Sequence, residues 1–314
     1  MVETVASVEL PINEKLEIRK QRIVPVSPLD GGEKRISVVT GTHGDELEGQ
    51  YVCYELARRI NENIGDLKGI VDIYPALNPL GIDSITRGIP GFDLDMNRIF
   101  PGSDDGSMAE YTAAKIVGDL KGSAACIDIH ASNIFLTEIP QIRISEETAP
   151  TLVPLAKKMN VDFIWVHGAA TVLEETLAHS LNSAGTPTLV VEMGVGMRIT
   201  KEYGDKITDG IFCLMKELGI WDGDVIEPTE PLISSDPDDV SFINAPVSGI
   251  FLPDTAHCTI VKKGDKIGRI VDPLHSAVLE EITAPCDGLV FTIREYPVVD
   301  EGSLIARILG GVCR

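Results

Sequence analysis

Two hydrophobic patterns alternate along the chain between about residues 35 and 220. Nearly continuous apolar runs, rich in β-branched residues, are typical of strands buried on both faces. Five such runs are RISVVTG (35–41), GIVDIYPA (69–76), AACIDIH (124–130), DFIWVHG (162–168) and TPTLVVEMG (186–194). Other segments have helical periodicity and often end at Gly or Asn. They span residues 46–63, 107–122, 147–160, 172–185 and 199–219. This alternation predicts an α/β domain with a mixed, largely parallel sheet.

The pattern changes after residue 222, where DGDVIEPTEPLISSDPDDVS is acidic, rich in Pro and Ser, and poor in helix formers. We interpret this stretch as a linker and expect a catalytic α/β domain over residues 1–225. Residues 226–314 then hold the linker and a small all-β domain. Two pairs of similar segments support an internal repeat in this part. They are APVSGIF (245–251) with APCDGLVF (284–291), and VKKGDKIGRI (261–270) with VDEGSLIARI (299–308).

The repeat resembles the barrel-sandwich hybrid of biotinyl and lipoyl carriers. Carriers of that class display a lysine at the hairpin between the two halves. The corresponding segment here, VDPLHSAVLEE (271–281), contains no lysine. A swinging-arm carrier is therefore disfavoured.

Composition and charge restrict the classes of partner. With 44% hydrophobic and 24% charged residues the chain is typical of a globular protein. A formal charge of -21 disfavours nucleic acid and anionic membranes, although a few arginines in a cleft can still bind an anionic substrate. The chain has no signal-peptide pattern and no run of 18 apolar residues, and its six cysteines are scattered singly. We expect a cytoplasmic protein with reduced thiols.

Polar side chains follow the expected strands, and in parallel sheets the ligand site lies at the carboxyl ends of the strands. His43, Glu46 and His130 all lie at such ends. Two imidazoles and one carboxylate leave a fourth position open for water, as in catalytic zinc sites, although other divalent ions also suit the set. The spacing His-x-x-Glu is by itself a weak signal, and a hydrogen-bonded polar loop is the alternative.

Two further features have the chemistry of an active site. The loop RGIPGFDLDMNRIFPG (87–102) is dense in glycine and arginine, and its adjacent Asn97 and Arg98 suit a substrate carboxylate. Glu192 ends the most apolar strand, where partial desolvation raises the pKa of a carboxyl group and suits it to proton transfer. A solvated turn and a structural ion pair are the respective alternatives.

Four motifs in order carry a resemblance to a known family. TGTHGDELEG (40–49), DLDMNRIFPG (93–102), DIHAS (128–132) and VVEMG (190–194) are similar to motifs of the aspartoacylase/succinylglutamate desuccinylase family, which has the zinc-carboxypeptidase fold. The dipeptide NP in YPALNPLG also fits. The resemblance covers roughly residues 35–220, and a β-rich C-terminal domain is consistent with the family.

The resemblance implies one Zn²⁺ per chain and a role for each matching residue. The implied zinc ligands are His43, Glu46 and His130, with Asp95 fixing the tautomer of His43. The other implied roles are substrate-carboxylate binding by Asn97 and Arg98, polarisation of the scissile carbonyl by Arg87, and general base catalysis by Glu192. The implied reaction is hydrolysis of the amide of an N-acylated amino acid or a related small carboxylate.

Several alternatives stay open at this point. A zinc carboxypeptidase acting on short peptides shares the metal site and the carboxylate clamp, and a non-catalytic binding module is a further reading. The segment after His130 departs from the family pattern, so the acyl group stays open, as do the amine and the oligomeric state, a homo-oligomer included. The residues that close the pocket are also open, with four candidates: Arg143, Arg198, Tyr203 and Tyr296.

Overall fold

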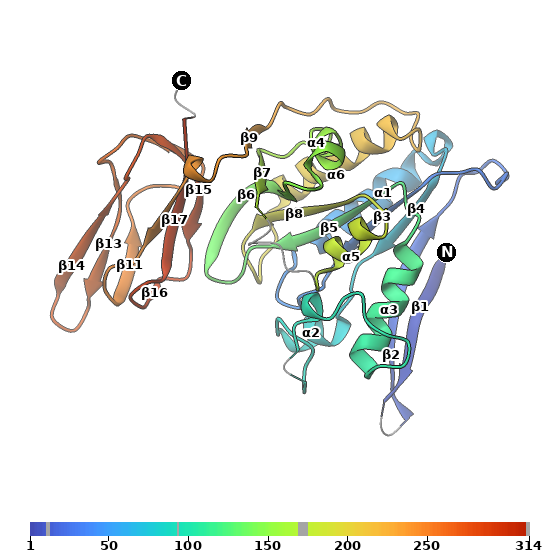
Figure 1. The fold of residues 1–314 in the computed structure, drawn as a ribbon, viewed down its shortest axis with the longest axis horizontal. Coiled ribbons are helices and arrows are strands. Elements are labelled where there is room, and N and C mark those ends of the chain that lie inside the picture. The colour runs from blue at the N-terminus through green and yellow to red at the C-terminus, as the bar shows by residue number, and fades with distance from the viewer. Residues whose placement is uncertain (11–12, 93, 169–174, 312–314) are drawn as a thin grey trace.

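A computed structural model describes residues 1–10, 13–92, 94–168 and 175–311 of the chain. Its central feature is a mixed sheet with the strand order β1-β2-β4-β3-β5-β8-β6-β15-β17-β10 (Figure 1). The strands of its α/β part are β1 (Val2–Glu9), β2 (Lys15–Ile23), β3 (Arg35–Thr40), β4 (Ile70–Tyr74), β5 (Ala125–Ala131), β6 (Leu136–Ser145), β7 (Phe163–His167), β8 (Thr188–Gly194) and β9 (Leu232–Ser234). β3, β4, β5 and β8 are parallel, whereas β6 is antiparallel to β8.

Helices cover both faces of this sheet. The side chains of each strand point alternately to the two faces, and both faces are apolar and buried. The helices are α1 (Glu48–Glu62), α2 (Pro79–Ser84), α3 (Met108–Leu120), α4 (Ala149–Ala156), α5 (Leu177–Ser183) and α6 (Lys201–Glu217), with short 3₁₀ turns η2 (Ile64–Asp66), η3 (Met96–Arg98) and η5 (Pro237–Asp239). Apolar residues of α1, α4 and α6 form one core with the sheet. α3 and α5 form a second core on the other face.

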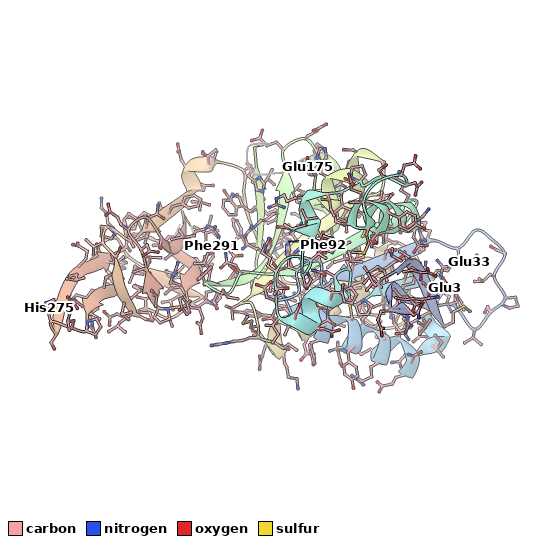
Figure 2. All side chains as sticks on the ribbon, turned by 90° about the horizontal axis from the view of Figure 1, so that it is seen from below. Glu3, Glu33, Phe92, Glu175, His275 and Phe291 are labelled. Carbon is pink, nitrogen blue, oxygen red and sulfur yellow. The ribbon has the colours of Figure 1, made fainter. Side chains whose placement is uncertain are left out.

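The C-terminal part is all-β and consists of β10 (Val240–Asn244), β11 (Gly249–Pro253), β12 (Thr259–Val261), β13 (Lys266–Asp272), β14 (Ala277–Thr283), β15 (Gly288–Arg294), β16 (Val298–Val299) and β17 (Leu304–Gly310). A separate antiparallel sheet has the order β14-β13-β11-β16. β15 and β17 instead continue the central sheet, since β15 pairs with β6 from Glu138 to Leu136. Phe291 lies at this junction and His275 at the far end of the C-terminal part (Figure 2).

An apolar cluster joins the two parts where the sheet continues. Phe291 of β15 packs against Phe163 and Trp165 of β7, with ring centroids 5.2 and 5.9 Å apart. Phe163 and Phe291 are fully buried. The C-terminal strands therefore meet the α/β part through both main-chain pairing and a shared core.

The expected α/β fold is confirmed, and all five expected strands and helices are present, although residues 172–174 of one expected helix lie outside the described residues. β1, β2 and β6 are not among the predicted strands, and β9 lies in the stretch predicted to be a linker. β7 runs parallel to β6 and therefore antiparallel to the direction of β8. The carboxyl end of β7 thus lies at the opposite end of the strands from the carboxyl ends of β3, β5 and β8.

Five cysteines are free thiols, and Cys313 lies outside the described residues. Among the helices of the described ranges, none is both long and apolar enough to cross a membrane.

Candidate active site

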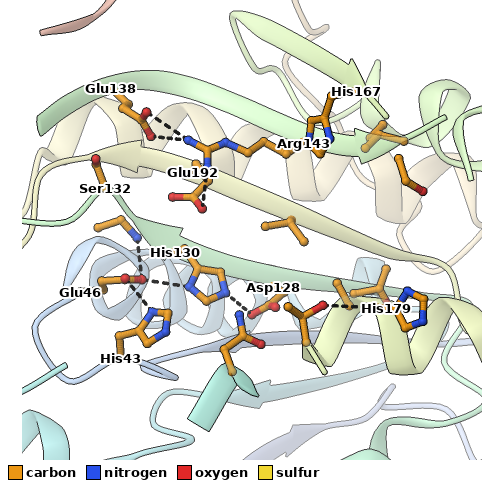
Figure 3. Close-up of a pocket in the computed structure, with 18 of the residues that line it drawn as sticks. His43, Glu46, Asp128, His130, Ser132, Glu138, Arg143, His167, His179 and Glu192 are labelled. Atoms are coloured by element: carbon orange, nitrogen blue, oxygen red, sulfur yellow. Dashed lines mark hydrogen bonds and ion pairs between the residues drawn. The ribbon is translucent and has the colours of Figure 1, made fainter. Parts of the chain in front are cut away.

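His43, Glu46 and His130 converge on one point at the carboxyl ends of β3 and β5. The Nδ1 atom of His43 lies 2.6 Å from Oε1 of Glu46, and the Nδ1 atom of His130 lies 2.9 Å from Oε2. One candidate ligand atom from each residue lies within 4.8 Å of the others. All three side chains are buried. Both imidazoles therefore present the same type of nitrogen to a shared carboxylate (Figure 3).

The far nitrogen of each imidazole faces a second carboxylate. Nε2 of His43 lies 3.0 Å from Oδ1 of Asp95, and Nε2 of His130 lies 3.2 Å from Oδ1 of Asp128. A carboxylate in this place holds the proton on Nε2 and leaves Nδ1 free to donate its lone pair. The arrangement suits two neutral imidazoles that ligate a cation through Nδ1.

The electrostatics of the cluster favour positive charge at its centre. Burial opposes ionisation of Glu46, but the adjacent imidazoles outweigh it and lower the pKa of Glu46 to about 2. Burial likewise opposes the imidazolium forms of His43 and His130, yet their carboxylate neighbours raise both pKa values. A divalent cation supplies the same positive charge without protons on Nδ1, so the residues present fit a metal ion.

A close backbone contact fixes the loop that carries the first two of these residues. A Cβ on Gly44 would lie 2.0 Å from the carbonyl carbon of Gly81, so only glycine fits at position 44. Asn78 caps α2 by accepting from the N–H of Gly81, and its Nδ2 donates to the carbonyl of Gly88. The turn after β3 and the loop that begins at Arg87 are thereby fastened to one another.

Glu192 lies beside the cluster because of strand register. It pairs with His130 across β5 and β8, so the two side chains project from the same face of the sheet. Burial raises the pKa of Glu192, although the charges of Arg143 and His130 oppose the shift. Nη1 of Arg143 lies 3.6 Å from Oε1 of Glu192. A carboxyl group of raised pKa therefore faces the same space as the three candidate ligands.

The loop over residues 87–102 brings its predicted residues to this place. Arg87 donates to Oε1 of Glu46 at 3.0 Å and to Asp95 at 3.3 Å. The Oδ1 atom of Asn97 accepts from the N–H of Leu177 at 2.9 Å, which leaves its Nδ2 donors for a ligand. Arg98 donates to the carbonyl of Asn97, and no acidic side chain in the described ranges forms an ion pair with it.

A cavity of about 600 Å³ connects these groups along the face of the sheet that α5 covers. Its size is typical of sites for small molecules. The residues of the wall include all three candidate ligands, Arg87, Asn97, Arg98 and Glu192, as well as His167 and His179. β7 runs opposite to β5 and β8, so His167 lies at the other end of the strands from His130. It still lines the cavity, because the cavity extends along the length of the strands.

The wall beyond Glu192 contains a group of charged residues, of which only Arg143 was predicted as a candidate for closing the pocket. Glu138 is buried and accepts two hydrogen bonds from Arg143, at 3.0 and 2.9 Å. Arg307 of β17 also donates to Glu138, and Thr292 of β15 does so at 3.2 Å. The C-terminal part thus supplies an arginine to the cavity (Figure 3 shows Glu138, Arg143 and Glu192).

Comparison with known sequences identifies the family. The profile of the succinylglutamate desuccinylase/aspartoacylase catalytic domain matches residues 33–218, which is more than half of the chain. The chain belongs to this family. A curated member, the N-alpha-acetyl-L-2,4-diaminobutyric acid deacetylase of Halomonas elongata, is 29% identical over 96% of this chain and 89% of its own length.

Solved structures of the family share the fold over nearly the whole chain. A succinylglutamate desuccinylase/aspartoacylase from Rhodobacter sphaeroides matches with a TM-score of 0.80 and 24% identity, over 98% of this chain and 94% of its own. The product-bound ectoine utilization protein EutE (DoeB) from Ruegeria pomeroyi matches with a TM-score of 0.81 and 20% identity, over the same shares. The family fold therefore includes the C-terminal β part.

Every residue that the resemblance implied lines the cavity except Asp95, which contacts His43. Of the four candidates for closing the pocket, only Arg143 is among the described residues of the wall. Arg198 forms an ion pair with Glu295, and Tyr203 contacts His257. Asp128 was missed, although its place two residues before His130 in a strand puts both side chains on one face.

Proposed function

We propose that this protein is a zinc-dependent hydrolase that removes a short acyl group from the nitrogen of an amino acid. The observation that carries the proposal is the convergence on one cavity of a His-Glu-His cluster, a carboxyl group of raised pKa and an arginine, Arg98, that forms no ion pair with the described residues. The curated relative deacetylates an N-acetylated diamino acid, which supports an N-acetyl amino acid as the first substrate to test.

Arg98 and Asn97 bind the carboxylate of the substrate in this proposal. Arg98 lines the cavity, and its guanidinium has no acidic partner in the described ranges. Asn97 is held by its Oδ1 atom, so that Nδ2 can donate alongside Arg98. Two donors of this kind orient a planar carboxylate and place the amide between Glu192 and the His-Glu-His cluster.

His43, Glu46 and His130 would hold the zinc ion, which when bound supplies a Lewis acid and lowers the pKa of a water molecule towards about 7. Arg87, which now contacts Glu46 and Asp95, is placed to donate to the carbonyl oxygen as negative charge develops there. Asp95 and Asp128 hold the protons on the far nitrogens of the two imidazoles.

Glu192 moves the proton in the proposed reaction. Its carboxylate takes a proton as water attacks the carbonyl carbon, and it then delivers that proton to the nitrogen as the C–N bond breaks. The products are a carboxylic acid and a free amine. A raised pKa suits both halves of this step, because the group must bind the proton and then release it near neutral pH.

The substitution Glu192→Gln tests the proposal. We expect the variant to retain one zinc per chain and to lose about 10²- to 10⁴-fold in kcat on N-acetyl amino acids, the usual contribution of a general acid–base group. Glu202→Gln, an exposed change on α6, is the control and should hydrolyse at the wild-type rate. Unchanged hydrolysis by zinc-loaded Glu192→Gln protein would overturn the assignment.

The choice of substrates separates this activity from that of a carboxypeptidase. N-acetyl-L-2,4-diaminobutyrate, other N-acetyl amino acids and N-succinyl amino acids should be compared with short unblocked peptides, all with zinc-loaded protein. Release of the acyl group, measured as free amine, is the expected result. Preferential release of C-terminal residues from the peptides would instead identify a carboxypeptidase.

A further inference from the structure

Glu138 occupies a position in the cavity where a carboxylate is bound by two arginines. Its side chain lines the cavity and is nearly inaccessible to solvent. Arg143 approaches it from the same strand, β6, and Arg307 approaches it from β17, 169 positions away in the chain. Two guanidiniums on one carboxylate form the kind of site that proteins use to bind an anionic ligand.

The two arginines have anchors that do not depend on Glu138. Both guanidiniums lie over the ring of Trp165, each 5.8 Å from its centroid. Arg307 also lies 5.5 Å from the ring centroid of Phe242. The Nε atoms of both arginines are buried and have no hydrogen-bond partner among the described residues, so one carboxylate does not use all of their donors. Stacking on aromatic rings holds a guanidinium in place.

The order of the strands places this arginine pair on the far side of Glu192 from His43 and His130. His43 follows β3, His130 lies near the end of β5, and Glu192 lies on β8, which is the next strand of the sheet. Arg143 and Arg307 lie beyond Glu192, on β6 and β17. Arg98 lies on the other side, in the loop whose Asp95 contacts His43. A substrate bound by Arg98 through its amino-acid carboxylate therefore extends its acyl group past Glu192 towards Glu138.

We propose that Glu138 determines the class of acyl group by filling, with the protein's own carboxylate, an anion site formed by Arg143 and Arg307. This inference rests on the proposed deacylase function. With Glu138 in place, a neutral acyl group such as acetyl is accepted. An acyl group that ends in a carboxylate, such as succinyl, meets the charge of Glu138 and finds both arginines already paired.

Removal of the Glu138 carboxylate opens the site, because it leaves two largely buried guanidiniums without their shared counter-ion. A dianionic ligand can then take the place of the missing side chain. The variant Glu138→Ala provides the space, and Glu138→Gln removes the charge at nearly constant volume. The double variant Glu138→Ala/Arg307→Met removes one wall of the opened site and is the matched control.

Binding of succinate and acetate, measured by isothermal titration calorimetry on the zinc-loaded protein, tests the proposal without any hydrolysis. We expect succinate to bind Glu138→Ala at least about 10-fold more tightly than the wild type, the effect of one charge-assisted contact. Acetate should bind all variants alike, and the double variant should lose the gain. Thermal unfolding checks the fold, and Glu138→Gln carries the same test if the alanine variant does not fold.

Succinate affinity within twofold of the wild type in a folded Glu138 variant would overturn the proposal, and so would an equal gain in the double variant. In hydrolysis, the ratio of kcat/KM on N-succinyl to that on N-acetyl amino acids should rise at least about 10-fold in Glu138→Ala. If the wild type hydrolyses neither substrate, the proposed function fails, whereas succinate binding still decides the role of Glu138.

Discussion

Asp128 is expected to control the metal affinity of the site through His130. Its side chain is almost fully buried, and its Oδ1 atom lies 3.2 Å from Nε2 of His130. No other described side chain forms an ion pair with Asp128. Asp95 differs, because it is more exposed and also contacts Arg87. The effect of Asp128 on a bound ion should therefore pass almost entirely through one imidazole.

The size of the effect follows from what each substitution removes. Asp128→Asn keeps an acceptor for the Nε2 proton but loses the charge, whereas Asp128→Ala loses both. Loss of such a partner weakens metal binding by about 10- to 100-fold, or about 1.4 to 2.7 kcal/mol. We expect the asparagine variant near the lower figure and the alanine variant near the upper one.

Competition with a chromophoric chelator at neutral pH measures the zinc affinity of both variants. Cys126→Ala is the matched control, since Cys126 is a buried residue on the same face of β5 and two positions further from His130. It should bind zinc as the wild type does. The reasoning is refuted if Asp128→Ala binds zinc within twofold of the wild-type affinity.

Substitutions at two nearby acids should affect zinc binding differently, and a third substitution tests the binding of the substrate carboxylate. Glu46→Ala should abolish stoichiometric zinc binding, measured by metal analysis after dialysis, because it removes the ligand that joins the two imidazoles. Glu48→Ala should retain zinc, but denaturant titration should show a free energy of unfolding about 3 kcal/mol lower. The reason is that buried Glu48 accepts hydrogen bonds from the N–H and Oγ1 of Thr200. Arg98→Met should raise KM for N-acetyl amino acids at least about 10-fold, and an unchanged KM would contradict the clamp.

Periodicity predicted the buried strands and the helices of the α/β part because their side chains follow the two periods closely. β6 was missed for the opposite reason. It contains Pro140 and carries Glu138, Gln141 and Arg143 among its apolar residues. Glu138 and Arg143 line the cavity and form an ion pair, so the strand lacks the continuous apolar pattern of its neighbours. The polar residues that line the cavity therefore interrupt the apolar pattern by which a buried strand is predicted.

The site was predictable where its residues are close in sequence or lie at strand ends. His43 and Glu46 share one turn, and His130 follows from the rule that binding sites lie at the carboxyl ends of parallel strands. Arg307 could not be found in this way, because it belongs to a repeat whose packing against β6 is a tertiary event. No local sequence pattern predicts which strand of the C-terminal part pairs with the central sheet.

The C-terminal part continues the central sheet of the α/β part, because β15 pairs with β6. A chain ending after α6 would leave the amino-terminal end of β6 as an unpaired edge and expose the rings of Phe163 and Trp165. It would also lack Arg307. Loss of the C-terminal part would therefore change both the edge of the central sheet and the wall of the cavity.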